Sequence, residues 1–203
     1  MYKITLRKEL NPTVTMMEIE APLVAKKAEP GQFIILRVNE DGERIPLTIA
    51  GYDREKGTVR IIFQIVGATT TLLNAKKEGE YIQDFVGPLG VATHIEGLKR
   101  VCIVGGGVGC AIALPIAQKL HEMGCEVTSV IGFRSKDLLI LEDEFKAASD
   151  RLFVMTDDGS YGTKGLVTNG VESVINREKV DLCVTIGPAV MMKFVSALTK
   201  KYE

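Results

Sequence analysis

The chain has almost no surplus of charge of either sign. Its 203 residues carry 25 lysines and arginines against 26 aspartates and glutamates, which leaves a formal net charge of −1. A nucleic-acid partner requires a basic surface, so this composition excludes one. The sequence also lacks an apolar run of the ~20 residues that a membrane helix needs, and residues 1–5 alternate like a strand and have no signal-peptide core. We therefore expect a cytoplasmic protein with no membrane partner.

Cysteine and histidine are scarce, with four copies and two copies respectively. The cysteines are Cys102, Cys110, Cys125 and Cys183. They form no C-x-x-C pair, so the sequence gives no signal for a zinc or iron–sulfur site. Three of them lie in apolar stretches, and we expect buried free thiols in a reducing compartment. His94 and His121 have no acidic or cysteine partner at ligand spacing, so packing or surface roles are expected for both.

The sequence divides into two halves that differ in their patterns of polar and apolar residues. Residues 1–95 consist of short runs of alternating polar and apolar residues that are broken by turn residues. The expected strands cover residues 3–10, 13–20, 32–38, 44–50, 58–66 and 80–86, and one short helix covers 69–77. This pattern predicts an N-terminal antiparallel six-stranded β-barrel, and we place the first domain at residues 1–95.

The second half, from residue 99 to residue 203, alternates strands with helices. Strands are expected at 101–104, 126–133, 151–156 and 181–186, and helices up to 123, over 137–149, up to about 177 and from 189 onward. The first of these strands is fully apolar, as a buried parallel strand should be. Strands that are joined by right-handed helical crossovers predict an α/β doubly wound parallel sheet.

A glycine-rich turn follows the first parallel strand. Its residues are Gly105, Gly106, Gly107, Val108 and Gly109. Glycines between a strand and a helix let the backbone approach a pyrophosphate, and the helix N-terminus then offers free N–H groups and a favourable dipole. The alternative is a merely tight turn.

This turn departs from the usual dinucleotide fingerprint in two ways. Cys110 stands where a third glycine is expected, and the second strand ends near Arg134 without the carboxylate that holds a ribose. The domain is therefore not a standard dehydrogenase domain, and the nucleotide must be held in another way.

Six segments, taken together and in order, resemble the ferredoxin–NADP reductase superfamily. They are residues 44–48, 67–70, 87–90, 105–109, 132–138 and 187–191. Each motif alone is weak, but the six occur in the right order over essentially the whole chain. The resemblance implies that the barrel holds FAD and that the parallel sheet binds NAD(P)H.

Residues 44–49 and 157–165 narrow the resemblance to one branch of the superfamily. That branch contains the dihydroorotate dehydrogenase electron-transfer subunit, sulfide dehydrogenase and the small subunit of NADH-dependent reduced ferredoxin:NADP oxidoreductase, an electron-bifurcating enzyme. Residues 187–193 are most similar to the last of these. Members of the branch pair with a larger iron–sulfur flavoprotein subunit, which implies such a partner here and ferredoxin as an indirect one.

The resemblance implies an FAD site in the barrel. Its residues would be Arg44, Ile45, Pro46, Leu47, Thr48, Gln64, Ile65, Val66, Gly67, Thr69 and Thr70. Arg44 would pair with an FAD phosphate, or else be a surface arginine of the barrel. Thr48, the one candidate catalytic residue, would place its hydroxyl near the flavin N5, or else be an ordinary strand residue. Thr69 and Thr70 would donate to the pyrophosphate, or cap a helix, or do both.

The NAD(P) site implied by the resemblance comprises the glycine turn and three further segments. Its residues would be Gly105, Gly106, Gly107, Val108, Gly109, Arg134, Asp158, Gly159, Gly187 and Pro188. The basic cluster of Arg134, Ser135 and Lys136 discriminates poorly between NAD(H) and NADP(H). The resemblance implies NAD(H), which we expect, with NADP(H) as the alternative. Met191 and Met192 are expected to belong to the core rather than to the cofactor site.

The resulting hypothesis is a flavoprotein electron-transfer subunit in which NADH reduces FAD and electrons pass to a partner. Proteins of this branch carry a C-terminal [2Fe–2S] segment with four cysteines, and the present sequence has no such segment. We expect this chain to be a truncated form, with loss of the cluster as the alternative. Two other functions stay open: an electron-transfer subunit of dihydroorotate dehydrogenase, and a regulatory nucleotide-binding module without turnover.

Overall fold

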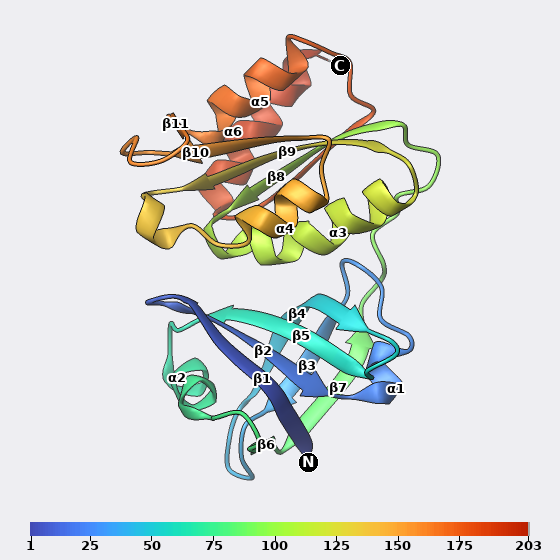
Figure 1. Cartoon of the computed structure of the whole chain (residues 1–203), viewed down its shortest axis with the longest axis vertical. Helices are drawn as coiled ribbons and strands as arrows, with labels where there is room; N and C mark the ends of the chain where they lie inside the picture. The colour runs from blue at the N-terminus through green and yellow to red at the C-terminus, as the bar shows by residue number, and fades with distance from the viewer. Residues whose placement is uncertain (203) are drawn as a thin grey trace. The chain divides into compact units, whose positions relative to one another are not determined.

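The computed structural model describes residues 1–202 and divides into two compact units. The first unit is Met1–Thr93, and the second begins at His94. Figure 1 shows an all-β unit with short helices and a unit in which helices flank a sheet. Each unit has its own hydrophobic core, so each is described by itself.

The first unit is built from one antiparallel sheet of seven strands. Its elements are β1 (Tyr2–Asn11), β2 (Val14–Glu20), α1 (Pro22–Ala25), β3 (Phe33–Arg37), β4 (Arg44–Asp53), β5 (Thr58–Gln64), α2 (Ala68–Ala75), β6 (Tyr81–Ile82) and β7 (Asp84–Leu89). The strand order is β6-β1-β2-β5-β4-β3-β7. Because the two end strands are consecutive in the chain, the sheet curls round into a barrel, and the predicted fold class is confirmed.

The predicted number of six strands is wrong by one. Residues 80–86 were expected to form a single strand, but the chain bends at Gln83 and forms two. The first of these, β6, pairs with β1, and the second, β7, pairs with β3. The N–H of Gln83 donates to the carbonyl oxygens of Arg37 and Val38 at 3.0 and 3.3 Å, which holds the bend in place.

The barrel interior is filled by alternate residues of the strands, as a sheet with one buried face requires. The largest fully buried side chains of this unit are Ile4, Met17, Ile19, Ile34, Leu36, Ile49, Ile61, Phe63, Leu73, Ile82 and Phe85. Each contributes roughly 1.5–3 kcal/mol relative to exposure. The core therefore fixes the register of the strands on which the candidate site stands.

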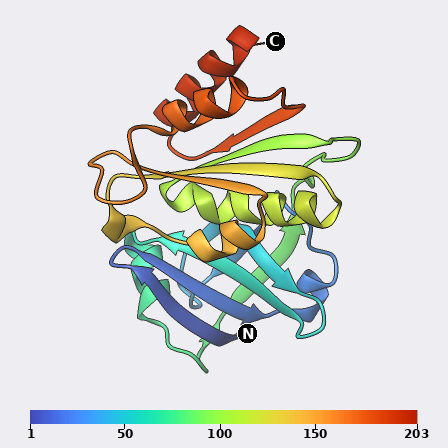
Figure 2. The same ribbon diagram turned by 45° about the horizontal axis from the view of Figure 1, so that its top comes forward.

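The second unit is a parallel sheet between helices. Its elements are β8 (Arg100–Gly106), a 3₁₀ turn (Gly107–Gly109), α3 (Cys110–Glu122), β9 (Glu126–Phe133), a 3₁₀ turn (Lys136–Leu138), α4 (Glu142–Ala147), β10 (Arg151–Thr156), β11 (Thr163–Lys164), α5 (Val167–Ile175), β12 (Leu182–Ile186), α6 (Ala189–Thr199) and a 3₁₀ turn (Lys200–Tyr202). The order is β11-β10-β9-β8-β12. Figures 1 and 2 show α3 and α4 on one face and α5 and α6 on the other, which confirms the doubly wound sheet.

Two local expectations in this unit are wrong. The helix predicted over 137–149 is a 3₁₀ turn followed by the shorter helix α4. Leu141, which precedes α4, has φ 62° in the left-handed region, so a helix cannot run through it. The fifth strand, β11, was not expected, and its two residues pair with Met155 and Thr156 at the end of β10.

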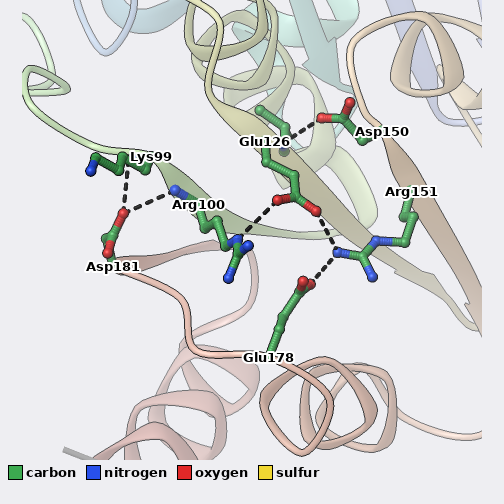
Figure 3. Close-up of polar contacts among 8 residues, drawn as sticks. Lys99, Arg100, Glu126, Asp150, Arg151, Glu178 and Asp181 are labelled. Carbon is green, nitrogen blue, oxygen red and sulfur yellow. Dashed lines mark hydrogen bonds and ion pairs between the residues drawn. The ribbon is translucent and has the colours of Figure 1, made fainter.

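The amino-terminal edge of the parallel sheet is held by a network of charged groups (Figure 3). Glu126 accepts from the guanidinium of Arg100 at 2.9 Å and from that of Arg151 at 3.0 Å, and Arg151 also pairs with Glu178. Asp181 accepts from two backbone N–H groups at the start of β8, at 2.8 and 2.9 Å. These N–H groups lower the pKa of Asp181. The network joins the first residues of β8, β9 and β10 to the segment that precedes β12.

All four cysteines are free thiols. Cys102, Cys110 and Cys125 are buried, as expected, whereas Cys183 is half-buried. Within residues 1–202, no group of three or more His, Cys, Asp or Glu side chains is placed to hold a metal ion. In the same part of the chain, no helix is long and apolar enough to cross a membrane.

Candidate functional site

The strand β4 changes its pairing partner halfway along its length. Residues Arg44–Thr48 pair with β3, whereas Ile49–Asp53 pair with β5, and the register shifts between Ile49 and Gly51. In the part of the chain that the structure describes, the first half of β4 therefore has one unpaired edge. Pro46 lies in this half, where its missing N–H costs no ladder hydrogen bond. The edge or bulge that a proline in a strand requires is present.

Side chains in the first half of β4 alternate between two faces. Ile45 and Leu47 pack against the barrel core. The alternation of a strand then places Arg44, Pro46 and Thr48 on the opposite face, where Arg44 and Pro46 are exposed and Thr48 is half-buried. Arg44, Pro46 and Thr48 thus share the face that the core does not use, whereas the side chains of the other two candidates on this strand, Ile45 and Leu47, face the core.

Arg44 is only loosely held within the barrel. Its Nη2 lies 3.4 Å from Oδ2 of Asp84, and its side chain is 62% exposed. The same carboxylate oxygen accepts from Nε of Arg37 at 2.7 Å, which is a much better hydrogen bond. An exposed ion pair of this length contributes little to stability. The guanidinium of Arg44 is consequently free to exchange Asp84 for a phosphate oxygen.

The hydroxyls at the start of α2 are engaged within the protein. Thr70 Oγ1 accepts from the N–H groups of Val66 and Gly67, both at 3.0 Å, and this is the capping role that was the alternative to ligand binding. Thr69 is buried, and its hydroxyl donates to Oε2 of Glu43 at 3.2 Å. What the helix start can offer an anion is therefore its backbone N–H groups, because the first turn of a helix leaves them without partners.

The segment that joins β5 to α2 is open. Gln64, Val66 and Gly67 are exposed and Ile65 is half-buried, and the segment is anchored by the N–H of Ile65, which donates to Thr13 O at 2.8 Å. A Cβ built on Gly67 would meet nothing within 4 Å. A loosely held arginine and a helix N-terminus form a donor set that suits the pyrophosphate of FAD, and the open glycine leaves room for it. Glu43 opposes this fit, because its carboxylate stands at the same helix start.

In the second unit, the glycine turn lies at the carboxyl edge of the sheet, between β8 and α3. Gly107 has φ +54°, a conformation that L side chains rarely adopt, and a Cβ there would meet nothing within 4 Å. Val108 is half-buried and Gly109 is buried. The open side of the turn at Gly107 is therefore the part that leaves room for a ligand against the backbone.

The other glycines of the turn serve internal packing. A Cβ on Gly109 would lie 2.5 Å from the carbonyl oxygen of Ile186 and 2.7 Å from Cα of Gly187, and a Cβ on Gly106 would collide with the sulfur of Met191. Gly105 is constrained in the same manner, with the sulfur of Cys110 2.8 Å from its built Cβ. The glycine turn and the turn after β12 thus interlock.

The interlocking brings Gly187 and Pro188 beside the glycine turn, at the carboxyl ends of the neighbouring strands β12 and β8. Met191 is partly buried and packs against the hydrophobic cluster of this unit, and Met192 is half-buried. The expectation of a core role agrees with the position of Met191. Pro188 precedes the 11-residue helix α6, so a second helix N-terminus opens at this edge.

The ends of β9 and β10 meet through their following loops. The N–H of Asp158 donates to Arg134 O at 3.2 Å, and the N–H of Lys136 donates to Oγ of Ser160 at 2.8 Å. The N–H of Ser160 donates to Oδ1 of Asp158 at 2.9 Å and lowers the pKa of that carboxyl. Gly159, with φ +77°, makes the turn possible. Arg134, Asp158 and Gly159 are thus neighbours at the carboxyl edge of the sheet.

Two residues that sequence reasoning did not select, Tyr161 and Glu142, complete these surroundings. Lys136 Nζ lies 5.4 Å from the ring centroid of Tyr161, whose hydroxyl donates to Oε1 of Glu142 at 3.0 Å. That hydrogen bond raises the pKa of Tyr161. Glu43 was likewise missed in the barrel. No sequence signal could have identified these contacts, because they join residues 19 to 26 positions apart on different elements.

Comparison with known proteins places the chain among electron-transfer proteins, although no family model matches it. It is 48% identical over 184 residues to the dihydroorotate dehydrogenase B (NAD(+)) electron transfer subunit homolog of Thermotoga maritima, with 91% of this chain and 65% of that protein covered. It is 34% identical over 202 residues to the dihydroorotate dehydrogenase B (NAD(+)) electron transfer subunit of Streptococcus pneumoniae, with 96% and 76% covered. An uncharacterized protein of Clostridium beijerinckii is 50% identical, with 99% and 71% covered. The chain thus spans about two thirds to three quarters of these relatives.

Solved structures give the same result. A chain from the structure of an NADH-dependent reduced ferredoxin-NADP oxidoreductase superimposes with a TM-score of 0.92 at 44% identity, covering 98% of this chain and 72% of that one. Phthalate dioxygenase reductase superimposes with a TM-score of 0.79 at 18% identity, covering 100% and 64%, which supports the fold alone. The chain belongs to the family of dihydroorotate dehydrogenase B electron transfer subunits and their homologues, flavoprotein electron-transfer subunits with the ferredoxin reductase-like fold.

Proposed function

We propose that this chain binds FAD in its barrel and a nicotinamide nucleotide on its parallel sheet, and transfers electrons between them and a partner subunit. The observation that carries the proposal is the first half of β4, where Arg44, Pro46 and Thr48 share the face turned away from the core. When bound, FAD supplies the chemistry of accepting a hydride and releasing electrons singly. The protein supplies binding, orientation and electrostatics.

In the proposed FAD site, Arg44 exchanges its long contact with Asp84 for the pyrophosphate. The N–H groups at the start of α2 add donors, and residues 64–67 follow the flavin with their backbone. Ile45 and Leu47 keep the strand fixed from the core side. Thr48 places its hydroxyl near the isoalloxazine. Thr69 and Thr70 act indirectly, because they hold the shape of the helix start rather than donate to the ligand.

In the proposed nucleotide site, the pyrophosphate of NAD(H) lies against Gly107 and Val108 at the start of α3. The loops that contain Arg134, Asp158 and Gly159 hold the adenosine side, and Gly187 and Pro188 leave room for the nicotinamide ring. Gly105, Gly106 and Gly109 support this site by allowing close packing rather than by touching the nucleotide. We favour NAD(H) over NADP(H), since both dihydroorotate dehydrogenase B relatives named above carry NAD(+) in their names and the solved oxidoreductase is named as NADH-dependent.

The proposed partner is a larger iron–sulfur flavoprotein subunit, with ferredoxin reached through it. The relatives are named as electron transfer subunits, which is the support for a partner. A [2Fe–2S] cluster belongs to the proposal only for a longer form of the chain. Free buried thiols suit a reducing compartment, and we propose a cytoplasmic location.

The nucleotide assignment is tested by anaerobic titration of the FAD-loaded protein with NADH and, separately, with NADPH. NADH is expected to bleach the visible flavin absorption at the lower concentration. A preference for NADPH of tenfold or more, equivalent to about 1.4 kcal/mol, would overturn the assignment. A protein that FAD cannot reconstitute would instead favour a regulatory nucleotide-binding module.

The flavin assignment is tested by three substitutions in the barrel. Arg44→Ala removes a charge-assisted pair worth about 1.5–3 kcal/mol, so the FAD dissociation constant should rise roughly tenfold to hundredfold. Arg54→Ala is the matched control, because it removes the same charge from a half-exposed arginine paired with Glu29. It should leave the FAD dissociation constant unchanged. Glu43→Gln removes the anion at the start of α2 and should strengthen FAD binding. Equal affinities for Arg44→Ala and Arg54→Ala would reject the site.

The second candidate function is electron transfer to dihydroorotate dehydrogenase, which the 34% identity to the Streptococcus pneumoniae subunit favours. The two functions differ in the electron acceptor. The NADH-reduced protein should be mixed with a dihydroorotate dehydrogenase catalytic subunit, or with ferredoxin and an iron–sulfur flavoprotein subunit. Faster reoxidation of the flavin by the dehydrogenase subunit would select the second candidate.

A further inference from the structure

Two cysteines face each other across neighbouring strands of the second unit. Cys102 of β8 and Cys183 of β12 are directly paired in the parallel ladder. Both side chains belong to the same hydrophobic cluster, beneath the helix pair α5 and α6, so they point to the same face of the sheet. Neighbouring strands lie about 4.8 Å apart, which is within the range of Cα separations that a disulfide spans.

The two thiols differ in access and in acidity. Cys183 is half-buried and lies on the edge strand of the sheet, whereas Cys102 is 1% exposed. The interaction of the two neighbouring thiols lowers the pKa of Cys183 against the opposing effect of burial. The same interaction, together with burial, raises the pKa of Cys102. A partly exposed thiol of lowered pKa beside a second thiol is the usual arrangement of a redox-sensitive pair.

The remaining cysteines do not share these properties. Cys110 is buried at the start of α3, and burial raises its pKa. Cys125 is buried, and its S–H donates to Leu98 O at 3.0 Å. Neither is paired with another cysteine in the sheet ladders. The contrast singles out one dithiol, which lies outside both candidate cofactor sites.

We propose that Cys183 and Cys102 form a peroxide-oxidisable dithiol that closes a disulfide between the strands β12 and β8. Cys183 is the attacking thiol and Cys102 is the resolving thiol. The inference does not depend on the proposed flavin function, because the oxidant is hydrogen peroxide itself.

The reaction balances in two steps. The Cys183 thiolate attacks one oxygen of hydrogen peroxide, so that an S–O bond forms, the O–O bond breaks and the departing hydroxide takes up a proton to leave as water. The sulfur of Cys102 then attacks that of Cys183; the S–S bond forms, the S–O bond breaks, and the hydroxide leaves as a second water with the proton of Cys102. Two thiols are oxidised to one disulfide, and one peroxide is reduced to two waters.

The test is mass spectrometry of the folded chain. The fully reduced protein is treated with hydrogen peroxide, free thiols are alkylated, and the protein is digested without reductant. The expected result is a loss of two hydrogen atoms from the intact mass, a cross-linked peptide containing Cys102 and Cys183, and return of both thiols with dithiothreitol. Recovery of both as alkylated free thiols would overturn the proposal, as would sulfinic acid on Cys183 with Cys102 still free.

Serine variants separate the two roles. In Cys183→Ser the thiol of Cys102 should stay reduced, because it is buried and its pKa is raised. In Cys102→Ser the thiol of Cys183 should be oxidised beyond the sulfenic acid, because no resolving thiol is present. Cys125→Ser is the matched control and should form the same cross-link as the wild type. If Cys102→Ser does not fold, the wild type and Cys183→Ser still decide, and oxidation of Cys102 in Cys183→Ser would reject the assigned roles.

Discussion

Replacing Gly109 by alanine should separate two turns that the structure holds in direct backbone contact. The added Cβ would lie 2.5 Å from Ile186 O, 2.7 Å from Gly187 Cα and 2.8 Å from Ile186 C, whereas real Cβ atoms keep at least 3.0 Å from such neighbours. All three are backbone atoms, so no side chain can rotate away. The end of β12 or the start of α3 has to move instead.

The expected cost follows from two opposing effects. Gly109 has φ −60° and ψ −22°, so alanine is compatible with its backbone and gains up to about 1 kcal/mol by reducing the conformational freedom of the unfolded chain. Forcing a methyl group into a close-packed contact costs about 1–3 kcal/mol. Because every clashing atom is backbone, we take the upper end of that cost and expect a net loss of about 2 kcal/mol. For a chain of this size, the loss lowers Tm by roughly 4–8 °C.

Thermal unfolding followed by far-ultraviolet circular dichroism measures this loss. The matched control is Gly51→Ala in β4, where a Cβ would meet only Arg60 side-chain atoms at ordinary distances of 3.6 and 3.8 Å. Alanine there should be neutral or slightly stabilising, since glycine weakens a strand. If Gly109→Ala had the same Tm as the wild type and the control, the two turns would not be in contact, and this prediction would be wrong.

Three further predictions concern the polar contacts. Glu126→Ala, which removes the shared partner of Arg100 and Arg151, should lower the free energy of unfolding in urea by about 1 kcal/mol, since the pairs are half-exposed; an unchanged midpoint would contradict it. The pKa of Asp181 is lowered by backbone N–H groups, so its contribution to folding stability is full above the unfolded carboxyl pKa of about 4 and is lost as the pH falls through the lower folded value. Asp181→Asn should therefore flatten the acid side of a plot of folding stability against pH, and parallel plots for the variant and the wild type would refute this. Thr70→Val, with Thr70→Ser as control, should cost about 1 kcal/mol of stability by removing the acceptor of two loop N–H groups; equal stabilities would exclude the capping role.

Much of the architecture is accessible from the sequence because it rests on local periodicity. The apolar run at 101–104 and the strand-like run at 58–66 predict a buried parallel strand and a strand of the barrel, which the structure has as β8 and as β5, the latter ending at Gln64. The prediction of a single strand over residues 80–86 failed because the sequence pattern there is continuous. What divides them is the pairing of β6 with β1 and of β7 with β3, and no local pattern specifies those partners.

The candidate site was predictable to the extent that strand order brings its residues together. Arg134 and Asp158 follow adjacent parallel strands, so their proximity follows from topology. The contact between Glu43 and Thr69 joins a loop to a helix start, and neither residue type indicates such a contact in the sequence. The roles of Gly106 and Gly109 were also hidden, because a glycine required by close packing and one required by a ligand look the same in a sequence.

The exchange of partners along β4 has a consequence for how such sites diverge between proteins. The unpaired edge of Arg44–Thr48 presents main-chain donors and acceptors, which every amino acid except proline carries in full. A molecule bound along this edge can be recognised by peptide groups as well as by Arg44 and Thr48, so the other side chains beside it can change while much of the affinity persists. Homologous sites of this design should keep their geometry long after their residues have ceased to match.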